Sequence, residues 1–268
     1  MKHCSLRSIT LMVLGALFAA AAPAADRTWN NAAGGAFATA ANWSGTLVPG
    51  TADRAIFNLA GPYTVTFAGN VTNDKLWING GQVSFDLGGS SYELTNVTSG
   101  LTVGNGAIWS LAGGGTLRST GTFQLGGAAG AGEIRLSGAD TEWIYTGSLS
   151  VGASNSGTLR IAAGAAVSTS TIGYIGLQSG GTGSVTVTGA GSQWTVGDIL
   201  YVGRLGGSGN LRIADGGSVS SLTGSIGGNL QIDLEDGYTP SAGDTFLLFS
   251  ADSLGGGLAS FSDRKSVV

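Results

Sequence analysis

Side chains that could carry chemistry are sparse in this sequence, and the acidic ones gather in two places. Asp140 and Glu142 lie close together, and Asp233, Glu235 and Asp236 form a second group. Two opposed carboxylates can cleave a glycosidic bond. On one extended strand, however, Asp140 and Glu142 would point the same way, and no basic catalytic partner lies near them in the sequence. We therefore expect no catalytic residues and no enzyme activity.

The segment 1–25 has the features of a secretory signal peptide. Lys2 and Arg7 give a basic start, the run 9–22 is apolar, and Ala22-Pro23-Ala24 fits a cleavage site. The apolar run is short for a membrane span of about 20 residues. We therefore expect the segment 1–25 to be removed and the rest of the chain to be exported.

Loss of this leader would also remove His3 and Cys4, the only histidine and cysteine in the chain. The exported part would then lack disulfides, thiol nucleophiles, Cys/His zinc sites and histidine acid–base groups, so we expect neither cofactor nor metal. Lys2 and Arg7 are two of the 12 basic residues, which leaves ten basic against 16 acidic side chains. Because no polybasic segment is present, we do not expect nucleic acid as a partner.

The exported part repeats with a nearly constant step of about 25 residues, which is in the range of solenoid repeats. One unit, Gly-x-apolar-x-apolar, is centred on Ile134, Leu159, Val185 and Leu211. A second unit ends in apolar-Gly, at Leu125-Gly126, Val151-Gly152, Ile175-Gly176 and Val202-Gly203. A third unit carries Trp143 and Trp194, which lie two steps apart, with shorter copies around Val167 and Val219.

This period predicts an all-β fold, a right-handed parallel β-helix with three faces and ~25 residues per coil. A propeller blade would need ~40 residues. The 49 glycines against four prolines, with 42% hydrophobic residues, favour short strands and tight turns over disorder. Like apolar residues should stack into inward ladders, and glycines should mark the corners.

The repeat also sets the domain boundaries. We expect a signal peptide at 1–25, an N-terminal β cap at 26–71, β-helix repeats at 72–228, and a C-terminal β cap and tail at 229–268. Within the caps, alternation of apolar and polar residues predicts strands at 54–59, 63–67, 229–234 and 246–249.

Arginines offer the first candidate for ligand contact. Arg118, Arg135, Arg160 and Arg212 occupy equivalent positions of the repeat, with Thr186 in the gap. Stacked in register, they would form a basic stripe that could contact an anionic polysaccharide or a lipid head group. A solvated sheet face is the more ordinary interpretation of such a stripe.

Trp143 and Trp194 offer the second candidate. Two tryptophans on one face of a β-helix could act as sugar-stacking platforms, although packing at a corner or under a loop is the more common arrangement. Calcium-binding Gly-Gly-x-Gly-x-Asp repeats are absent, because Gly206-Gly207-Ser208-Gly209 lacks the aspartate.

The repeats resemble those of autotransporter-type passengers, in Tyr201-Val202-Gly203 and in the run 209–219. The opening segment, with Trp29-Asn30-Asn31, Asn42-Trp43, Pro49-Gly50 and Ala55-Ile56-Phe57, is similar to secreted bacterial repeat proteins of the PEP-exosortase type, as is the closing segment 233–253. The resemblance implies a non-catalytic, extracellular or cell-surface β-solenoid of a Gram-negative bacterium, structural or adhesin-like. Its partner would be a polysaccharide or another cell-surface component.

Two alternatives to this function remain open: a polysaccharide lyase-like β-helix, and a carbohydrate-binding module that acts through Trp143 and Trp194. The sequence departs from the resemblance because it shows neither a C-terminal barrel pattern nor a Pro-Glu-Pro sorting signal. We expect membrane attachment only through an anchor that this sequence does not contain. The sequence is compatible with a truncated product, a fragment or a freely exported protein. It does not predict an oligomeric state.

Overall fold

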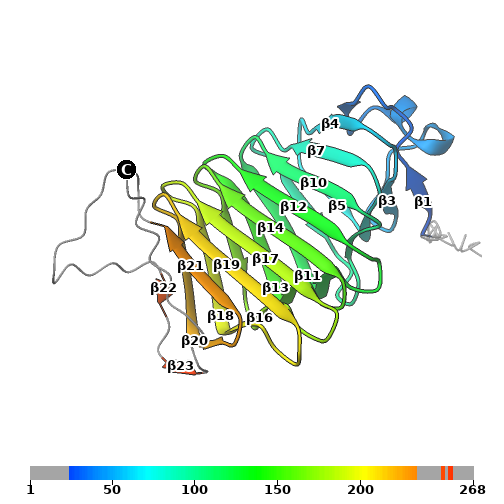
Figure 1. The fold of residues 1–268 in the computed structure, drawn as a ribbon. Helices are drawn as coiled ribbons and strands as arrows, with labels where there is room; N and C mark the ends of the chain where they lie inside the picture. The colour runs from blue at the N-terminus through cyan, green and yellow to red at the C-terminus, as the bar shows by residue number, and fades with distance from the viewer. Residues whose placement is uncertain (1–23, 234–248, 251–252, 256–268) are drawn as a thin grey trace, which may run out of the picture.

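The computed structural model describes residues 24–233, 249–250 and 253–255, and within them the chain forms a solenoid of stacked parallel strands (Figure 1). Helical structure in this part is confined to two short 3₁₀ turns, η1 (Ala40–Asn42) and η2 (Ser44–Thr46). The prediction of an all-β, parallel β-helix is thereby confirmed. The leader predicted at 1–25 lies almost entirely outside the described residues.

The described strands form three sheets. Sheet I, the broad face in Figure 1, contains β2 (Gly35–Ala36), β4 (Pro62–Thr66), β7 (Gln82–Asp86), β10 (Ala107–Ala112), β12 (Gly132–Ser137), β14 (Ser156–Ala162), β17 (Thr182–Thr188), β19 (Ser208–Ala214) and β21 (Asn229–Asp233). Sheet II contains β5 (Val71–Asn73), β8 (Ser91–Leu94), β11 (Gly115–Leu125), β13 (Thr141–Val151), β15 (Ala166–Thr169), β16 (Gly173–Ile175), β18 (Gln193–Val202), β20 (Ser218–Ile226), β22 (Phe249–Ser250) and β23 (Ser253–Gly255). Sheet III contains β1 (Asp26–Thr28), β3 (Arg54–Phe57), β6 (Lys75–Asn79) and β9 (Leu101–Gly104).

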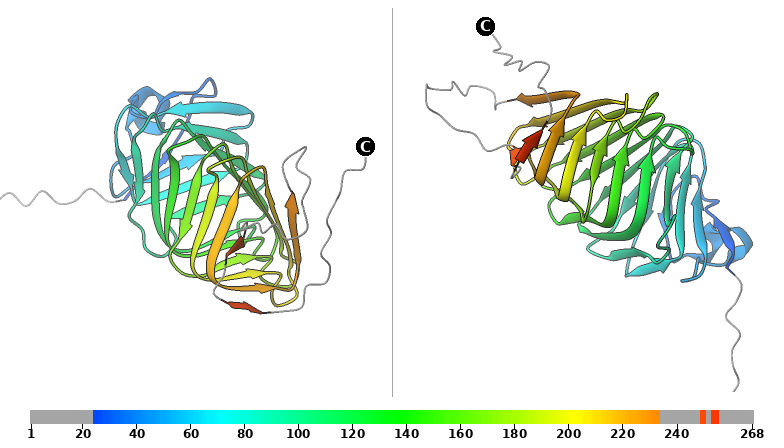
Figure 2. Two further views of the ribbon diagram at one scale, coloured as in Figure 1. Left: turned by 90° about the vertical axis from the view of Figure 1, so that its left-hand side faces the viewer. Right: turned by 90° about the horizontal axis from the view of Figure 1, so that it is seen from below.

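The apolar ladders that the repeat predicts run through the interior of the solenoid. In sheet I the Cα partners follow the column Tyr63, Val83, Trp109, Ile134, Leu159, Val185, Leu211 and Leu230. The four residues singled out from the sequence, Ile134 to Leu211, are buried. Since each coil buries its apolar face only against its neighbours, this column is the continuous core that holds the stack together. The views along and beneath the stack in Figure 2 show the sheets wrapped around that interior.

The step between coils is not constant along this column. It stays close to the repeat length through the centre, between partners such as Ile134 and Leu159. It is shorter at both ends, from Tyr63 to Val83 and from Leu211 to Leu230. The coils at the two ends of the column therefore have shorter loops than the central ones.

Two sets of glycines form one corner of the solenoid, and in both sets a Cβ would collide with backbone atoms. Gly126, Gly152, Gly176 and Gly203 have φ between 69° and 75°, the left-handed region that glycine adopts without strain. The second set, Gly132, Gly157, Gly183 and Gly209, lies at the start of the sheet I strands and is required for close packing. A Cβ on Gly183, for example, would lie 2.1 Å from Val151 O. The predicted glycine corners are thus present.

The long strands of sheet II differ from the prediction of three separate faces in every coil. β11 and β13 each run through 11 residues and so cover two faces without a break. The bend lies at the in-register pair Gly121 and Gly147, which have φ of 108° and 143°. A Cβ on Gly147 would lie 1.8 Å from Gly121 O, so only glycine allows the strands to turn here while staying paired.

The N-terminal coils are filled by aromatic side chains. Trp29, Phe37, Trp43 and Phe57 are buried and contact one another, with Trp29 and Trp43 edge to face at 5.1 Å. The strands predicted at 54–59, 63–67 and 229–234 are confirmed in β3, β4 and β21, with slightly different bounds. Of the segment 246–249, only Phe249 is described. The division into caps and repeats stays a prediction.

Candidate binding surfaces of the solenoid

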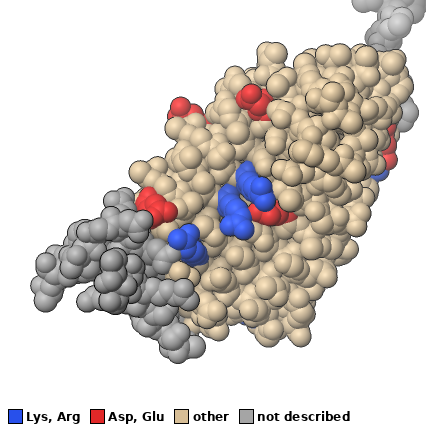
Figure 3. All heavy atoms as spheres, turned by 45° about the horizontal axis from the view of Figure 1, so that its top comes forward, with Lys and Arg blue, Asp and Glu red and all other residues tan. Residues whose placement is uncertain are grey.

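The outward face of sheet I carries a row of arginines. Arg135, Arg160, Thr186 and Arg212 are successive Cα partners, as the repeat predicts. Figure 3 shows basic side chains in a row on this face, with acidic side chains beside and beyond them. Because neighbouring strands are about 4.8 Å apart, Arg160 and Arg212 stand about 10 Å from each other along the axis.

Glu133 partly neutralises this row. Its Oε1 accepts hydrogen bonds from Nε of Arg135 and Nε of Arg160, both at 2.8 Å. The hydrogen bond from Arg135 is the main cause that lowers the pKa of Glu133, and Arg160 acts in the same direction against the opposing effect of burial. The row is therefore an ion-paired, mostly solvated surface with a modest positive excess.

Arg118 does not belong to this row, which corrects the sequence interpretation. It lies on β11 of sheet II, with Glu93 and Ile144 as Cα partners. The error arose because Gly115-Thr116-Leu117-Arg118 copies the sheet I pattern, whereas the turn before it, with Gly113 and Gly114 at positive φ, has already moved the chain to the next sheet.

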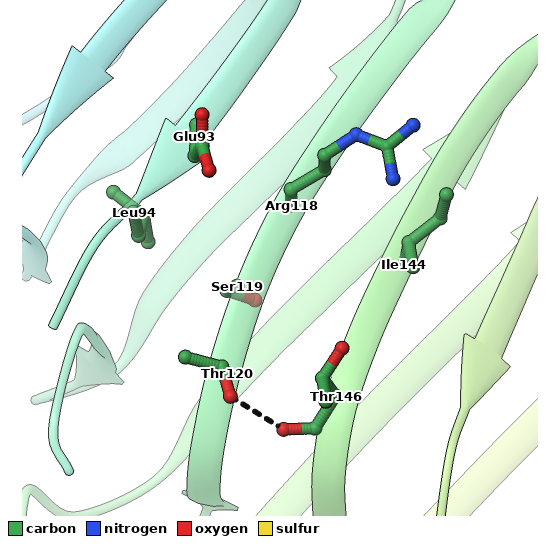
Figure 4. A pocket seen from close by; sticks show the side chains of 7 residues that line it. All are labelled: Glu93, Leu94, Arg118, Ser119, Thr120, Ile144 and Thr146. Carbon is green, nitrogen blue, oxygen red and sulfur yellow. Dashed lines mark hydrogen bonds between the residues drawn. The ribbon is translucent and has the colours of Figure 1, made fainter. Parts of the chain in front are cut away.

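Arg118 instead borders a shallow depression of about 180 Å³ on sheet II. Its walls are Glu93, Leu94, Arg118, Ser119, Thr120, Ile144 and Thr146. Figure 4 shows the Arg118 side chain extending away from Glu93 toward Ile144. Thr120 Oγ1 donates a hydrogen bond to Thr146 O at 2.8 Å, which closes one end of the depression. The cavity is small for an organic ligand.

Trp143 and Trp194 are not available for stacking against a sugar. Both side chains have 0% exposure, and they occupy one interior column of sheet II with Val167 between them. Trp143 Nε1 donates to Ser119 Oγ at 2.9 Å, and Trp194 Nε1 donates to Thr169 Oγ1 at 3.1 Å. The sugar-platform interpretation is therefore wrong for these two residues: they are core residues.

Asp140 and Glu142, the acidic grouping that the structure describes, do not form a catalytic pair either. Asp140 is exposed in the turn before β13 with φ of 63°, whereas Glu142 lies on the strand itself, so the two do not share a strand face. The side chain of Asp233, and Glu235 and Asp236 altogether, lie outside the described residues. Within the described part of the chain, no three His, Cys, Asp or Glu side chains come together as ligands for a metal ion.

A surface that the sequence analysis missed lies at the outward side of β16 and β18. Tyr174 and Tyr201 are Cα partners, and their rings stack with a 5.5 Å centroid separation and a 7° interplanar angle. Arg204 Cζ lies 4.4 Å from the Tyr201 centroid and 5.4 Å from that of Tyr174. The sequence contains a signal for this pair, because Tyr-Ile-Gly and Tyr-Val-Gly occur at the same position of the repeat. Successive residues of a strand point to opposite sides, so the tyrosine before an inward Ile or Val must point outward.

A second aromatic–arginine contact lies on sheet III. Arg54 Cζ is 3.6 Å from the ring centroid of Trp77, and the guanidinium also forms an ion pair with Asp26. This arginine therefore already has a carboxylate partner within the chain.

Comparison with known proteins finds similarity to an adhesin. A segment of 97 residues, 35% of this chain, is 33% identical to part of "Adhesin BmaC autotransporter" of Brucella suis biovar 1 (strain 1330), of which it covers 3%. No protein-family model matches the chain, and no solved structure matches it significantly. No helix of the described residues is long and apolar enough to span a membrane. The chain is thus a parallel β-solenoid with a partial sequence similarity to an autotransporter adhesin.

Proposed function

We propose that this protein is a non-catalytic, adhesin-like β-solenoid that works outside the cell or at the cell surface. The observation that carries the proposal is the unbroken parallel stack, in a chain similar to part of an autotransporter adhesin. Such a stack is a stiff support that repeats its outward side chains at the strand spacing of about 4.8 Å. Its contribution to attachment is geometric: rows of side chains face a polymer or another surface.

Two further features support a binding role over catalysis. The outward face of sheet I presents arginine and threonine side chains in register, and Glu133 already pairs with two of the arginines. The depression beside Arg118 contains one carboxylate, that of Glu93, whereas glycoside hydrolysis uses two. Contact along a face, rather than cleavage in a pocket, fits these surfaces.

Attachment can be tested with polystyrene beads coated with the full chain. We expect coated beads to be retained under flow on glass bearing cell-surface polysaccharide, and beads coated with heat-denatured chain to be lost. Equal retention of the two bead types would contradict an adhesin role that depends on the folded solenoid.

Location can be tested in the source cells. Antibody against the chain should label intact cells or the culture medium, and the exported form should begin near Asp26 by mass spectrometry. Full-length chain confined to the cytoplasm would contradict the proposal.

A further inference from the structure

The tyrosine pair of β16 and β18 is held in place by the core beneath it. Tyr174 precedes Ile175 and Tyr201 precedes Val202, and both aliphatic side chains have 0% exposure. The ladder fixes the two tyrosines side by side, with both rings half-buried. The stacked pair is therefore preorganised, so a ligand would not have to order it on binding.

Serines flank the pair in the same row of Cα partners, and they leave one side of it open. Ser150, the partner of Tyr174 on β13, is buried. Ser225, the partner of Tyr201 on β20, is only half-buried. A serine side chain is too short to cover an aromatic ring on the adjacent strand. The described part of this row continues only to Gly255 on β23, which has no side chain, so these residues leave room for another flat group beside the Tyr201 ring.

Arg204 adds a positive charge to this surface. It follows Gly203 at the corner, where its backbone N–H donates to Gly176 O at 2.9 Å, and its Nη1 donates to Tyr174 Oη at 3.3 Å. Among the described residues no carboxylate lies within ion-pair distance of Arg204. Arg54 differs from Arg204 in this respect: it also lies over an aromatic ring, that of Trp77, but it forms an ion pair with Asp26.

The turn that carries Arg204 also presents an exposed apolar side chain. Leu205 is 69% exposed and has φ of 49°, in a turn closed by the hydrogen bond from Gly207 N–H to Arg204 O at 2.8 Å. The turn therefore places an exposed apolar side chain directly after Arg204 in the chain.

We propose that Tyr174, Tyr201 and Arg204 form a binding site for a carboxylated sugar residue of a glycan. The C–H face of the pyranose packs against the tyrosine surface, and the sugar carboxylate pairs with the Arg204 guanidinium in place of the carboxylate that the described residues do not supply. This inference deepens the proposed function, on which it rests, by naming the ligand class.

The test is isothermal titration of the full chain with sugars that differ only in the acidic group. Oligogalacturonate is compared with its methyl ester, and sialyllactose with its own methyl ester, because a uronic acid and a sialic acid are two sources of the same carboxylated pyranose. We expect at least one acidic sugar to bind at submillimolar concentration and its neutral counterpart to bind about tenfold more weakly.

Variants separate the contributions of the three residues. Tyr201→Ser should weaken binding of the acidic sugar about tenfold, and Tyr201→Phe should keep most of the affinity because it keeps the ring. Arg204→Gln should remove the preference for the acidic over the neutral sugar. Lys75→Gln is the control, a basic residue of β6 in sheet III away from the pair, and should bind like the wild type.

Each outcome bears on the proposal. No binding of either acidic sugar by wild-type chain with its normal circular dichroism spectrum would overturn it, as would equal affinity for acidic and neutral forms or unchanged affinity in Tyr201→Ser. Absence of sugar binding by wild-type chain whose beads still attach would overturn this site while leaving the adhesin role standing. Failure of wild-type beads to attach, although the chain binds the sugar, would contradict the adhesin role and leave the sugar site standing.

Discussion

Indole N–H groups in the solenoid interior differ in whether they have a partner. Trp143 Nε1 donates to the buried hydroxyl of Ser119, whereas Trp109 Nε1 is buried and has no hydrogen-bond partner among the described residues. A buried donor without a partner costs about 1–3 kcal/mol, so the two tryptophans should respond differently to the same substitution.

Replacing each of these tryptophans by phenylalanine tests that difference. Both changes reduce packing, but Trp143→Phe also leaves Ser119 Oγ without its donor, and Trp109→Phe removes a donor that had no acceptor. We expect Trp143→Phe to be more destabilising by about 1–3 kcal/mol, measured by urea unfolding. Equal destabilisation would show that the N–H of Trp109 finds a partner in solution.

The ion pairs of Glu133 predict a pH-dependent contribution to stability. The pKa of Glu133 is lowered in the folded chain, mainly by the hydrogen bond from Arg135, so the stabilising contribution is present above the ordinary value of 4.5 and is lost as the pH falls through the folded pKa. Both arginines are more than a third exposed, which limits the contribution to about 0.2–1 kcal/mol.

Glu133→Gln should therefore lower the thermal midpoint at pH 7 and have no effect in strong acid, in melts recorded by circular dichroism. Glu93→Gln is the matched control, since Glu93 is an exposed carboxylate without an ion pair among the described residues. A difference between Glu133→Gln and wild type that persists in strong acid would contradict this account.

At the scale of elements, the corner between sheets II and I depends on backbone atoms in close approach. Gly152 N–H donates to Leu125 O at 2.8 Å, and the next corners repeat the bond from Gly176 to Val151 and from Gly203 to Ile175. Since any side chain here would meet backbone rather than a movable side chain, the corner should tolerate no substitution.

Comparing Gly152→Ala with Gly206→Ala separates the destabilisation caused by a steric clash from that caused by an unfavourable backbone conformation. Both glycines have positive φ, 75° and 82°, but a Cβ would lie 2.2 Å from Gly183 N in the first case and no closer than 3.7 Å to any atom in the second. We expect Gly206→Ala to cost about 1 kcal/mol and Gly152→Ala at least about 2 kcal/mol more, by urea unfolding. A similar loss of stability in the two variants would mean that the backbone at the corner can move apart to accommodate the added Cβ.

At the scale of the whole molecule, the stack is quasi-one-dimensional. Each coil contacts its neighbours, so among the described residues the end strands β2 and β21 are paired on one side only. The steps at the two ends of the sheet I column, from Tyr63 to Val83 and from Leu211 to Leu230, are also its shortest. Stability should therefore be highest in the middle of the solenoid and fall toward both ends.

Hydrogen exchange followed by mass spectrometry measures this gradient. Amides of β12, β14 and β17 should be the most protected, and those of β2 and β21 should exchange first, because local opening begins where one neighbour is missing. Uniform protection from end to end would show that the solenoid unfolds as one cooperative unit. Faster exchange in the centre would contradict the one-dimensional picture.

The sequence alone determined the architecture, because residues one repeat apart become neighbours when the coils stack. The spacing of apolar residues and glycines therefore predicts the core and the corners directly. The column from Ile134 to Leu211 and the glycine corners needed no more than spacing. Only the tertiary structure decided which side of a sheet, and which sheet, each functional candidate occupies. Arg118 has the local pattern of Arg135 but lies in another sheet, since the turn before it sets its place.

Burial is the other property that separates the candidate residues. Trp143 and Trp194 were the conspicuous aromatic residues, yet their parity on the strand turns them inward, while the less conspicuous Tyr174 and Tyr201 face outward. A one-residue shift along a strand exchanges core for surface, and the strand register was fixed by pairing between coils. Spacing therefore determined the solenoid, and three-dimensional register determined which of its side chains can meet a ligand.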